Sequence, residues 1–139
     1  MWTPVRNKTV KISQIVTKIQ HIGIPTNDIE KTITFYESLG FENVYTTVNE
    51  KANEKVAFLR LENMLLEIYQ NGHAVNKSGA IDHIALDVVD INAAFEIAQV
   101  DGYHLLDDSI QFLPFWENGV KFFTILGPNG EKVEFNQRL

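Results

Sequence analysis

Two stretches of the chain share one pattern of apolar and polar positions, and they begin 62 residues apart. Ile19 to Asp28 reads I-Q-H-I-G-I-P-T-N-D, and Ile81 to Asp90 reads I-D-H-I-A-L-D-V-V-D. The same offset separates three further landmarks, namely His21 from His83, Asp28 from Asp90, and Gly40 from Gly102. An offset kept over several landmarks indicates one supersecondary unit used twice. The pattern therefore predicts two pseudo-symmetric modules.

The first module is predicted to run strand, helix, strand, strand, strand. β-branched residues from Ile15 onward predict a central strand that ends at Pro25, because proline lacks a backbone N–H for the sheet. Asn27 or Asp28 then caps a helix whose apolar positions keep helical spacing until Gly40. Three further strands are predicted, over residues 43–48, 56–61 and 64–70, the last two joined by a Glu62-Asn63 turn.

The second module is predicted to repeat this order after a polar linker. We expect a strand over residues 80–88, a helix from Ile91 to Gly102, a long segment over 103–119 and a final hairpin over 120–137. The domain is thus divided into module 1 (15–71), linker (72–79) and module 2 (80–139). Residues 1–14 have no counterpart and form either a loose arm or an added edge strand that packs Trp2 and Ile12.

Composition excludes several functional classes. With 139 residues the chain has room for one ordinary domain. Its 12 basic and 18 acidic residues give a net charge of -6, which disfavours nucleic acid as a partner. The absence of cysteine excludes disulfides and thiolate chemistry. No apolar run is long enough for a membrane span or signal peptide. The expected location is the cytoplasm.

Each predicted module carries a histidine on its first strand and a glutamate on its last. These pairs are His21 with Glu67 and His83 with Glu134. A single histidine on an apolar strand is more often structural, and a single strand glutamate usually faces water. Here the same pair recurs at matching places, so packing about a pseudo-twofold axis would bring four side chains together. Two imidazoles and two carboxylates suit a divalent first-row metal, with positions left for substrate oxygens.

From about Thr17 to Gln137 the chain resembles the vicinal oxygen chelate superfamily, and glyoxalase I (lactoylglutathione lyase) more than its other branches. The motifs concerned are H-I-G-I from His21, the helix from Asp28 to Phe41, L-L-E-I around Glu67, H-I-A-L from His83, and G-P-N-G-E-K-V-E-F ending on Phe135. The resemblance implies an α+β fold in which two tandem βαβββ modules form a curved, incomplete mixed β-barrel around a metal site. It also implies that His21, Glu67, His83 and Glu134 are the metal ligands.

The resemblance to glyoxalase I further implies proton transfer on a small metal-chelated substrate. An example is a methylglyoxal–thiol hemithioacetal, which becomes a 2-hydroxyacyl thioester. Glu134 is the expected base, and Glu67 would serve the opposite face of the substrate. The expected cofactor is one divalent ion: nickel, zinc, cobalt or manganese. A homodimer is expected, with the site either within one chain or across a swapped dimer.

Four residues are candidates for substrate contact. Asn71, four positions after Glu67, matches an asparagine of the bacterial glyoxalase I pattern, whereas Pro25 stands where that pattern has a glutathione-binding arginine. The identity of the thiol in the substrate is therefore left open. Phe115 and Trp116 are interpreted as pocket, core or interface aromatics, and Lys121 as a solvated charge or a contact for an anionic substrate.

The residues of the chain leave three alternative functions open. An acyl-CoA epimerase of the methylmalonyl-CoA type usually has glutamine at the position of Glu67. An extradiol dioxygenase would use two histidines and one carboxylate on iron, which leaves Glu67 unexplained. A non-catalytic ligand- or drug-binding protein commonly lacks the four ligands. We favour the metal-dependent lyase or isomerase.

Overall fold

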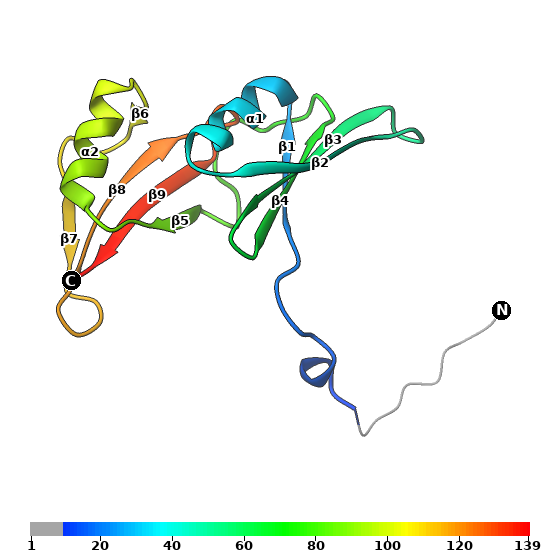
Figure 1. The fold of residues 1–139 in the computed structure, drawn as a ribbon. Coiled ribbons are helices and arrows are strands. Elements are labelled where there is room, and N and C mark those ends of the chain that lie inside the picture. Colours follow the sequence, from blue (N-terminus) through cyan, green and yellow to red (C-terminus); the bar gives the residue numbers. More distant parts are fainter. Residues whose placement is uncertain (1–9) are drawn as a thin grey trace.

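The computed structural model describes residues 10–139, which form two α+β modules (Figure 1). Module 1 contains β1 (Ile22–Thr26), α1 (Ile29–Ser38), β2 (Glu42–Asn49), β3 (Glu54–Leu61) and β4 (Met64–Gln70). Module 2 contains β5 (His83–Asp87), α2 (Ile91–Val100), β6 (His104–Leu105), β7 (Gln111–Leu113), β8 (Val120–Leu126) and β9 (Lys132–Arg138). The predicted α+β fold of paired modules is confirmed.

Each module has its own open sheet. The strand order is β1-β4-β3-β2 in the first sheet and β5-β9-β8-β6 in the second, where β7 also pairs with β8. In both sheets the first strand runs parallel to the last strand of its module, and the other pairs are antiparallel. Strand β9 occupies one edge of β8. The other edge of β8 is shared by β6 and β7. Module 2 thus has two short strands where module 1 has the continuous β2.

Local signals set the ends of both helices. Asp28 and Asp90 each accept a backbone N–H of the first helical turn at 3.1 Å, which satisfies a donor that the helix leaves unpaired. Gly40 and Gly102, just beyond the helices, have φ of 104° and 75°, a region that favours glycine. Within the described residues, no helix is long and apolar enough to cross a membrane.

Helices cover only one face of each sheet. The core beneath them includes Leu59, Leu66, Ile68, Phe123 and Ile125, all with 0% exposure. Successive strand residues point to opposite faces, so the neighbours of these core residues face away from the helices. This alternation puts Glu67, next to Leu66 and Ile68, on the uncovered face of the first sheet. Glu134, next to buried Val133, lies on the uncovered face of the second.

The first strand differs from its prediction. It begins at Ile22 instead of Ile15, and Pro25 lies inside it, paired with Tyr69. The prediction of a central strand ended by Pro25 is wrong because β1 lies at the edge of its sheet. An edge strand has one side without a hydrogen-bonded neighbour, so the missing N–H of a proline is tolerated there.

The segment before β1 extends away from both sheets (Figure 1). It contains a single turn of 3₁₀ helix, Ile12–Gln14, and its residues 10–21 are all exposed. Ile12 is 74% exposed, so the alternative in which it packs on the domain as part of an edge strand is wrong. Trp2, the other residue of that prediction, lies outside the described residues.

Candidate functional site

The uncovered face of module 1 carries His21 and Glu67. The His21 ring packs edge-on against Phe58 with 5.8 Å between centroids, and Phe58 is the cross-strand partner of Glu67. Gly23 leaves room beside this pair, because a Cβ there would lie 3.9 Å from Glu67 Oε1 and 3.3 Å from the Tyr69 ring. Module 1 therefore presents one imidazole and one carboxylate around Phe58.

The uncovered face of module 2 carries the matching pair, His83 and Glu134. His83 Nε2 lies 3.6 Å from Glu134 Oε1, and His83 Nδ1 lies 2.9 Å from Asp82 Oδ2. Donation from Nδ1 to Asp82 leaves the lone pair on Nε2, the atom that faces Glu134. Hydrogen bonds from His83, and then from Lys132 at 3.2 Å, lower the pKa of Asp82. The carboxylate of Asp82 thus stays charged and orients the imidazole.

The two histidines are held in the same way. His21 Nδ1 lies 3.0 Å from Gln20 Oε1, and Gln20 precedes Asp82 by the same 62 residues that separate the histidines. Each histidine thus follows a residue whose side-chain oxygen accepts from Nδ1. The prediction from sequence missed both acceptors, although the repeat placed them in register. A hydrogen-bond acceptor on the second nitrogen is the usual arrangement for a metal-binding histidine.

The Glu134 carboxylate is half-buried and fixed by a neighbour. Its Oε2 accepts from Asn136 Nδ2 at 3.0 Å, and its side chain is 14% exposed. Asn136 lies two residues further along β9 and hence on the same face, a signal that the sequence prediction overlooked. A cavity of about 240 Å³ adjoins the carboxylate and is lined by Asp82, His83, Leu106, Asp107, Thr124, Lys132 and Glu134. The carboxylate therefore faces space that a small substrate could enter.

A single chain does not bring the two pairs together. Among residues 10–139, no three His, Asp or Glu side chains lie close enough to hold a metal ion. Each half-site still offers the donors that a divalent first-row ion takes, an imidazole nitrogen and a carboxylate oxygen. The residues of the two half-sites thus suit a divalent ion, with each half-site providing half of the ligands. A complete set requires the uncovered faces of two modules to meet.

Two of the predicted substrate contacts, Asn71 and Lys121, come from different modules. Asn71 follows β4, and its Oδ1 accepts from the backbone N–H of His73 at 2.9 Å. Its amide NH₂ is the part left for other contacts. Lys121 lies on β8 two residues before Phe123, whose ring packs against the α2 residue Phe95. Lys121 therefore points to the opposite face of the sheet from Glu134.

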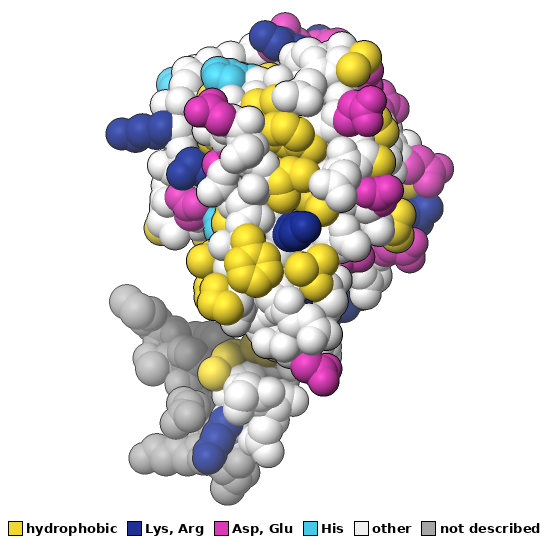
Figure 2. Space-filling view, turned by 90° about the vertical axis from the view of Figure 1, so that its left-hand side faces the viewer, with side chains coloured by type: hydrophobic (Ala, Val, Ile, Leu, Met, Phe, Trp, Pro, Cys, Tyr) yellow, Lys and Arg dark blue, Asp and Glu magenta, His cyan; other side chains and the backbone are white. Residues whose placement is uncertain are grey.

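The aromatic segment after β7 is largely exposed. Phe115 is 55% and Trp116 is 70% exposed, and Arg138 Cζ lies 4.0 Å from the Trp116 ring centroid. Arg138 shares one face of β9 with Glu134, so Trp116 lies at the far end of the uncovered face. Figure 2 views the molecule from the side of module 2 and shows a patch of exposed hydrophobic side chains with a basic side chain in its middle and acidic side chains around it. This surface is available to a substrate or to another protein chain.

Comparison with known proteins gives one family match. Residues 20–122 match the model of the Glyoxalase/Bleomycin resistance protein/Dioxygenase superfamily. This stretch includes His21, Glu67 and His83 and ends before Glu134. The chain is also 35% identical over 126 residues to YwbC, an uncharacterized protein of Bacillus subtilis (strain 168). That similarity covers 87% of this chain and 98% of YwbC.

Many solved structures share the fold, including the following two. FosX, a fosfomycin resistance protein of Listeria monocytogenes complexed with Mn(II) and sulfate, superposes with a TM-score of 0.70 at 14% identity, covering 89% of this chain and 94% of FosX. A glyoxalase I mutant from Zea mays superposes with a TM-score of 0.68 at 20% identity. That similarity covers 86% of this chain and 44% of the maize chain.

Proposed function

Because the chain belongs to the Glyoxalase/Bleomycin resistance protein/Dioxygenase superfamily, we propose that it is a metal-dependent lyase or isomerase of the glyoxalase type. The observation that carries the proposal is the repeated His–Glu pair on the uncovered face of each module. The proposed substrate is a small metal chelator such as a methylglyoxal–thiol hemithioacetal, and the product is a 2-hydroxyacyl thioester. The cytoplasmic location expected from the sequence stays a prediction.

The proposed metal site is assembled from two copies of the chain. His21 and Glu67 of one copy would meet His83 and Glu134 of the other. A symmetric dimer repeats each contact, so this arrangement makes two equivalent sites. The separation of the half-sites within one chain supports it. The solved FosX structure contains Mn(II), which supports a divalent ion in a protein of this fold. Nickel, zinc, cobalt and manganese are the candidates.

Glu134 is the proposed general base. It would take the proton from the substrate carbon next to the carbonyl and return it to the adjacent carbon, so that substrate and product are isomers. Asn136 holds one oxygen of this carboxylate and leaves the other toward His83. Glu67 would approach the opposite face of the substrate. A bound divalent ion would supply Lewis-acid stabilisation of negative charge on the substrate oxygens.

A substrate panel tests the proposed reaction. The purified protein is analysed for metal, and its turnover is measured with methylglyoxal plus glutathione, cysteine or coenzyme A in the presence of each of the four metals. Pro25 replaces an arginine expected to bind the glutathione carboxylate, so we include thiols other than glutathione. Failure of the metal-loaded protein to convert any of these adducts would contradict the proposal, and acyl-CoA esters and catechols would then test the epimerase and dioxygenase alternatives.

Metal binding is expected to raise the melting temperature, because an ion that binds only the folded state stabilises it. At a free metal concentration about 100 times Kd, the expected stabilisation is about 2.7 kcal/mol. Thermal melts with nickel or zinc are compared with melts in chelator. The His83→Ala/Glu134→Ala variant serves as the control and should lose the shift. Equal melting temperatures with metal loading confirmed by analysis would contradict the predicted site.

A further inference from the structure

The contact between the two modules contains a closed ring of buried hydrogen bonds. Its members are Thr26 at the end of β1, Thr32 in α1 and Asn129 in the turn between β8 and β9, which are 0%, 0% and 9% exposed. Thr26 Oγ1 donates to Asn129 Oδ1, Asn129 Nδ2 donates to Thr32 Oγ1, and the two hydroxyl oxygens are hydrogen-bonded, each at 2.9 Å. Apart from Tyr36, no other residue with a polar side chain is buried in the described part of the chain. The three residues of the ring join one module to the other.

A second polar contact lies beside this ring. Tyr36 of α1 is 1% exposed, and its hydroxyl donates to Glu131 Oε2 at 3.0 Å. Burial, and then the charge of Glu131, raises the pKa of Tyr36, so the phenol stays a donor. The other oxygen of Glu131 accepts the backbone N–H of Asn129 at 2.7 Å. Thr26, Thr32, Tyr36, Asn129 and Glu131 are called the inter-module cluster below.

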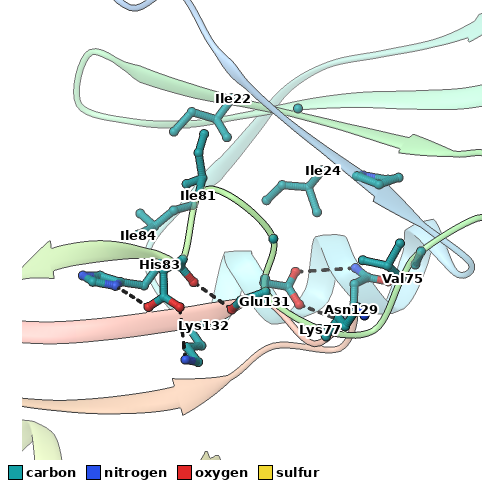
Figure 3. Close-up of a pocket in the computed structure, with 16 residues that line it drawn as sticks. Ile22, Ile24, Val75, Lys77, Ile81, His83, Ile84, Asn129, Glu131 and Lys132 are labelled. Carbon is teal, nitrogen blue, oxygen red and sulfur yellow. Dashed lines mark hydrogen bonds and ion pairs between the residues drawn. The ribbon is translucent and has the colours of Figure 1, made fainter.

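The turn that carries Asn129 also packs closely against the linker between the modules. Gly130 has φ of 77°, and a Cβ there would lie 2.1 Å from the backbone carbon of Asn76 in the linker. The turn therefore lies directly against the linker and tolerates only glycine at this position. Figure 3 shows Asn129 and Glu131 beside Ile24 of β1 and the linker. They line a mainly aliphatic cavity of about 170 Å³ between the modules.

The repeat shows that these polar groups are not required by the module fold itself. At the offset of 62 residues, Thr26, Thr32 and Tyr36 correspond to Val88, Ala94 and Ala98. Module 2 forms the corresponding strand and helix with apolar residues instead, Val88 directly after β5 and Ala94 and Ala98 in α2. The hydroxyl groups of module 1 therefore serve its contact with the turn of module 2.

Within the described residues, the corresponding turn of module 1 makes no such contact. Glu62 and Asn63, between β3 and β4, are both exposed. The contact is thus one-sided, with the turn of module 2 inserted against module 1. The one-sided contact breaks the pseudo-symmetry at the place where the two modules meet.

We propose that Asn129 and Glu131 are positioning residues, which fix the angle between the modules and thereby the relative placement of the two half-sites. This proposal rests on the two-copy site. In a symmetric dimer, both metal sites can be completed at the same time only if each chain holds its two half-sites at one defined angle. Apolar contact is non-directional, whereas a closed ring of hydrogen bonds restricts rotation between the groups it joins.

Spin-label distances test the proposal directly. The native chain has no cysteine, so Lys31→Cys on α1 and Glu96→Cys on α2, both exposed positions, provide a labelling site in each module. Labelled chain is diluted with excess unlabelled chain of the same variant, so that distances within one chain dominate. We expect a narrow distribution of label-to-label distances in the native background. For Asn129→Ala we expect a broader or shifted distribution. Thr26→Val/Thr32→Ala, which gives module 1 the residues of module 2, should show the same change.

A matched control removes a different contact between the modules. Tyr103 Oη donates to Ser38 Oγ at 2.8 Å at an exposed position, and Tyr103→Phe should leave the distribution narrow. Calorimetry with nickel should show weaker binding by Asn129→Ala, although every predicted ligand is retained. A lower melting temperature with unchanged distances and unchanged metal affinity would reduce the cluster to a stabilising role and overturn the proposal. If distances change but the native protein binds no metal, the two-copy metal site fails while the control of module angle stands.

Discussion

Glu134→Gln is expected to lower turnover by about 10² to 10⁴-fold while metal stays bound. Glutamine keeps nearly the same shape and a side-chain oxygen, so it can still act as a ligand and still accept from Asn136. Its neutral amide cannot take the substrate proton. The measurement is kcat with the most active metal and substrate, together with the metal content of the same sample.

Two variants serve as controls for Glu134→Gln. Glu67→Gln should have a milder effect, since the epimerase branch of the superfamily usually has glutamine at that position. Glu96→Gln, on the exposed surface of α2, should leave turnover unchanged. Full turnover by metal-loaded Glu134→Gln would show that another group is the base.

Mixing two inactive variants is expected to restore about a quarter of the native turnover if each site spans two copies. One variant lacks the module 1 pair, as His21→Ala/Glu67→Ala, and the other lacks the module 2 pair, as His83→Ala/Glu134→Ala. Random exchange makes about half of the dimers mixed, and each mixed dimer holds one intact site of two. Turnover is measured after joint unfolding and refolding, and native mass spectrometry confirms the mixed dimers.

The outcome distinguishes the two possible arrangements of the site. Each variant refolded alone is the control and should stay inactive. If mixed dimers form without recovery of turnover, the site does not span two copies. If no dimers form in the native protein under assay conditions, while turnover is present, the site is completed within one chain.

The helices and the repeat were predictable because their signals are local or periodic. Asp28 and Asp90 cap helices through backbone groups three residues away, and Gly40 and Gly102 end them through their own φ angles. The two histidines are matched by the 62-residue offset, and the two glutamates by their place on the last predicted strand of each module. None of these features depends on how the modules pack, so the sequence by itself determined them.

The first strand shows where local signals fail. The β-branched residues from Ile15 to Ile19 have high strand propensity, yet they lie in the exposed segment before β1. A strand is stabilised by a paired neighbour and a covering layer, and this segment has neither within the described residues. The place of Pro25 likewise depended on strand order, because only an edge strand accommodates it.

Only the tertiary structure decided which side chains share a face and how the modules meet. Lys121 and Glu134 both lie on predicted strands, but the position of α2 puts Lys121 on the covered side of the sheet. Asn129 meets Thr26 across 103 residues, and Glu131 meets Tyr36 across 95. The separation of the two half-sites within one chain arises from the same docking of modules. Such contacts join residues that no local or periodic signal relates, because they depend on the surfaces that meet when the modules pack.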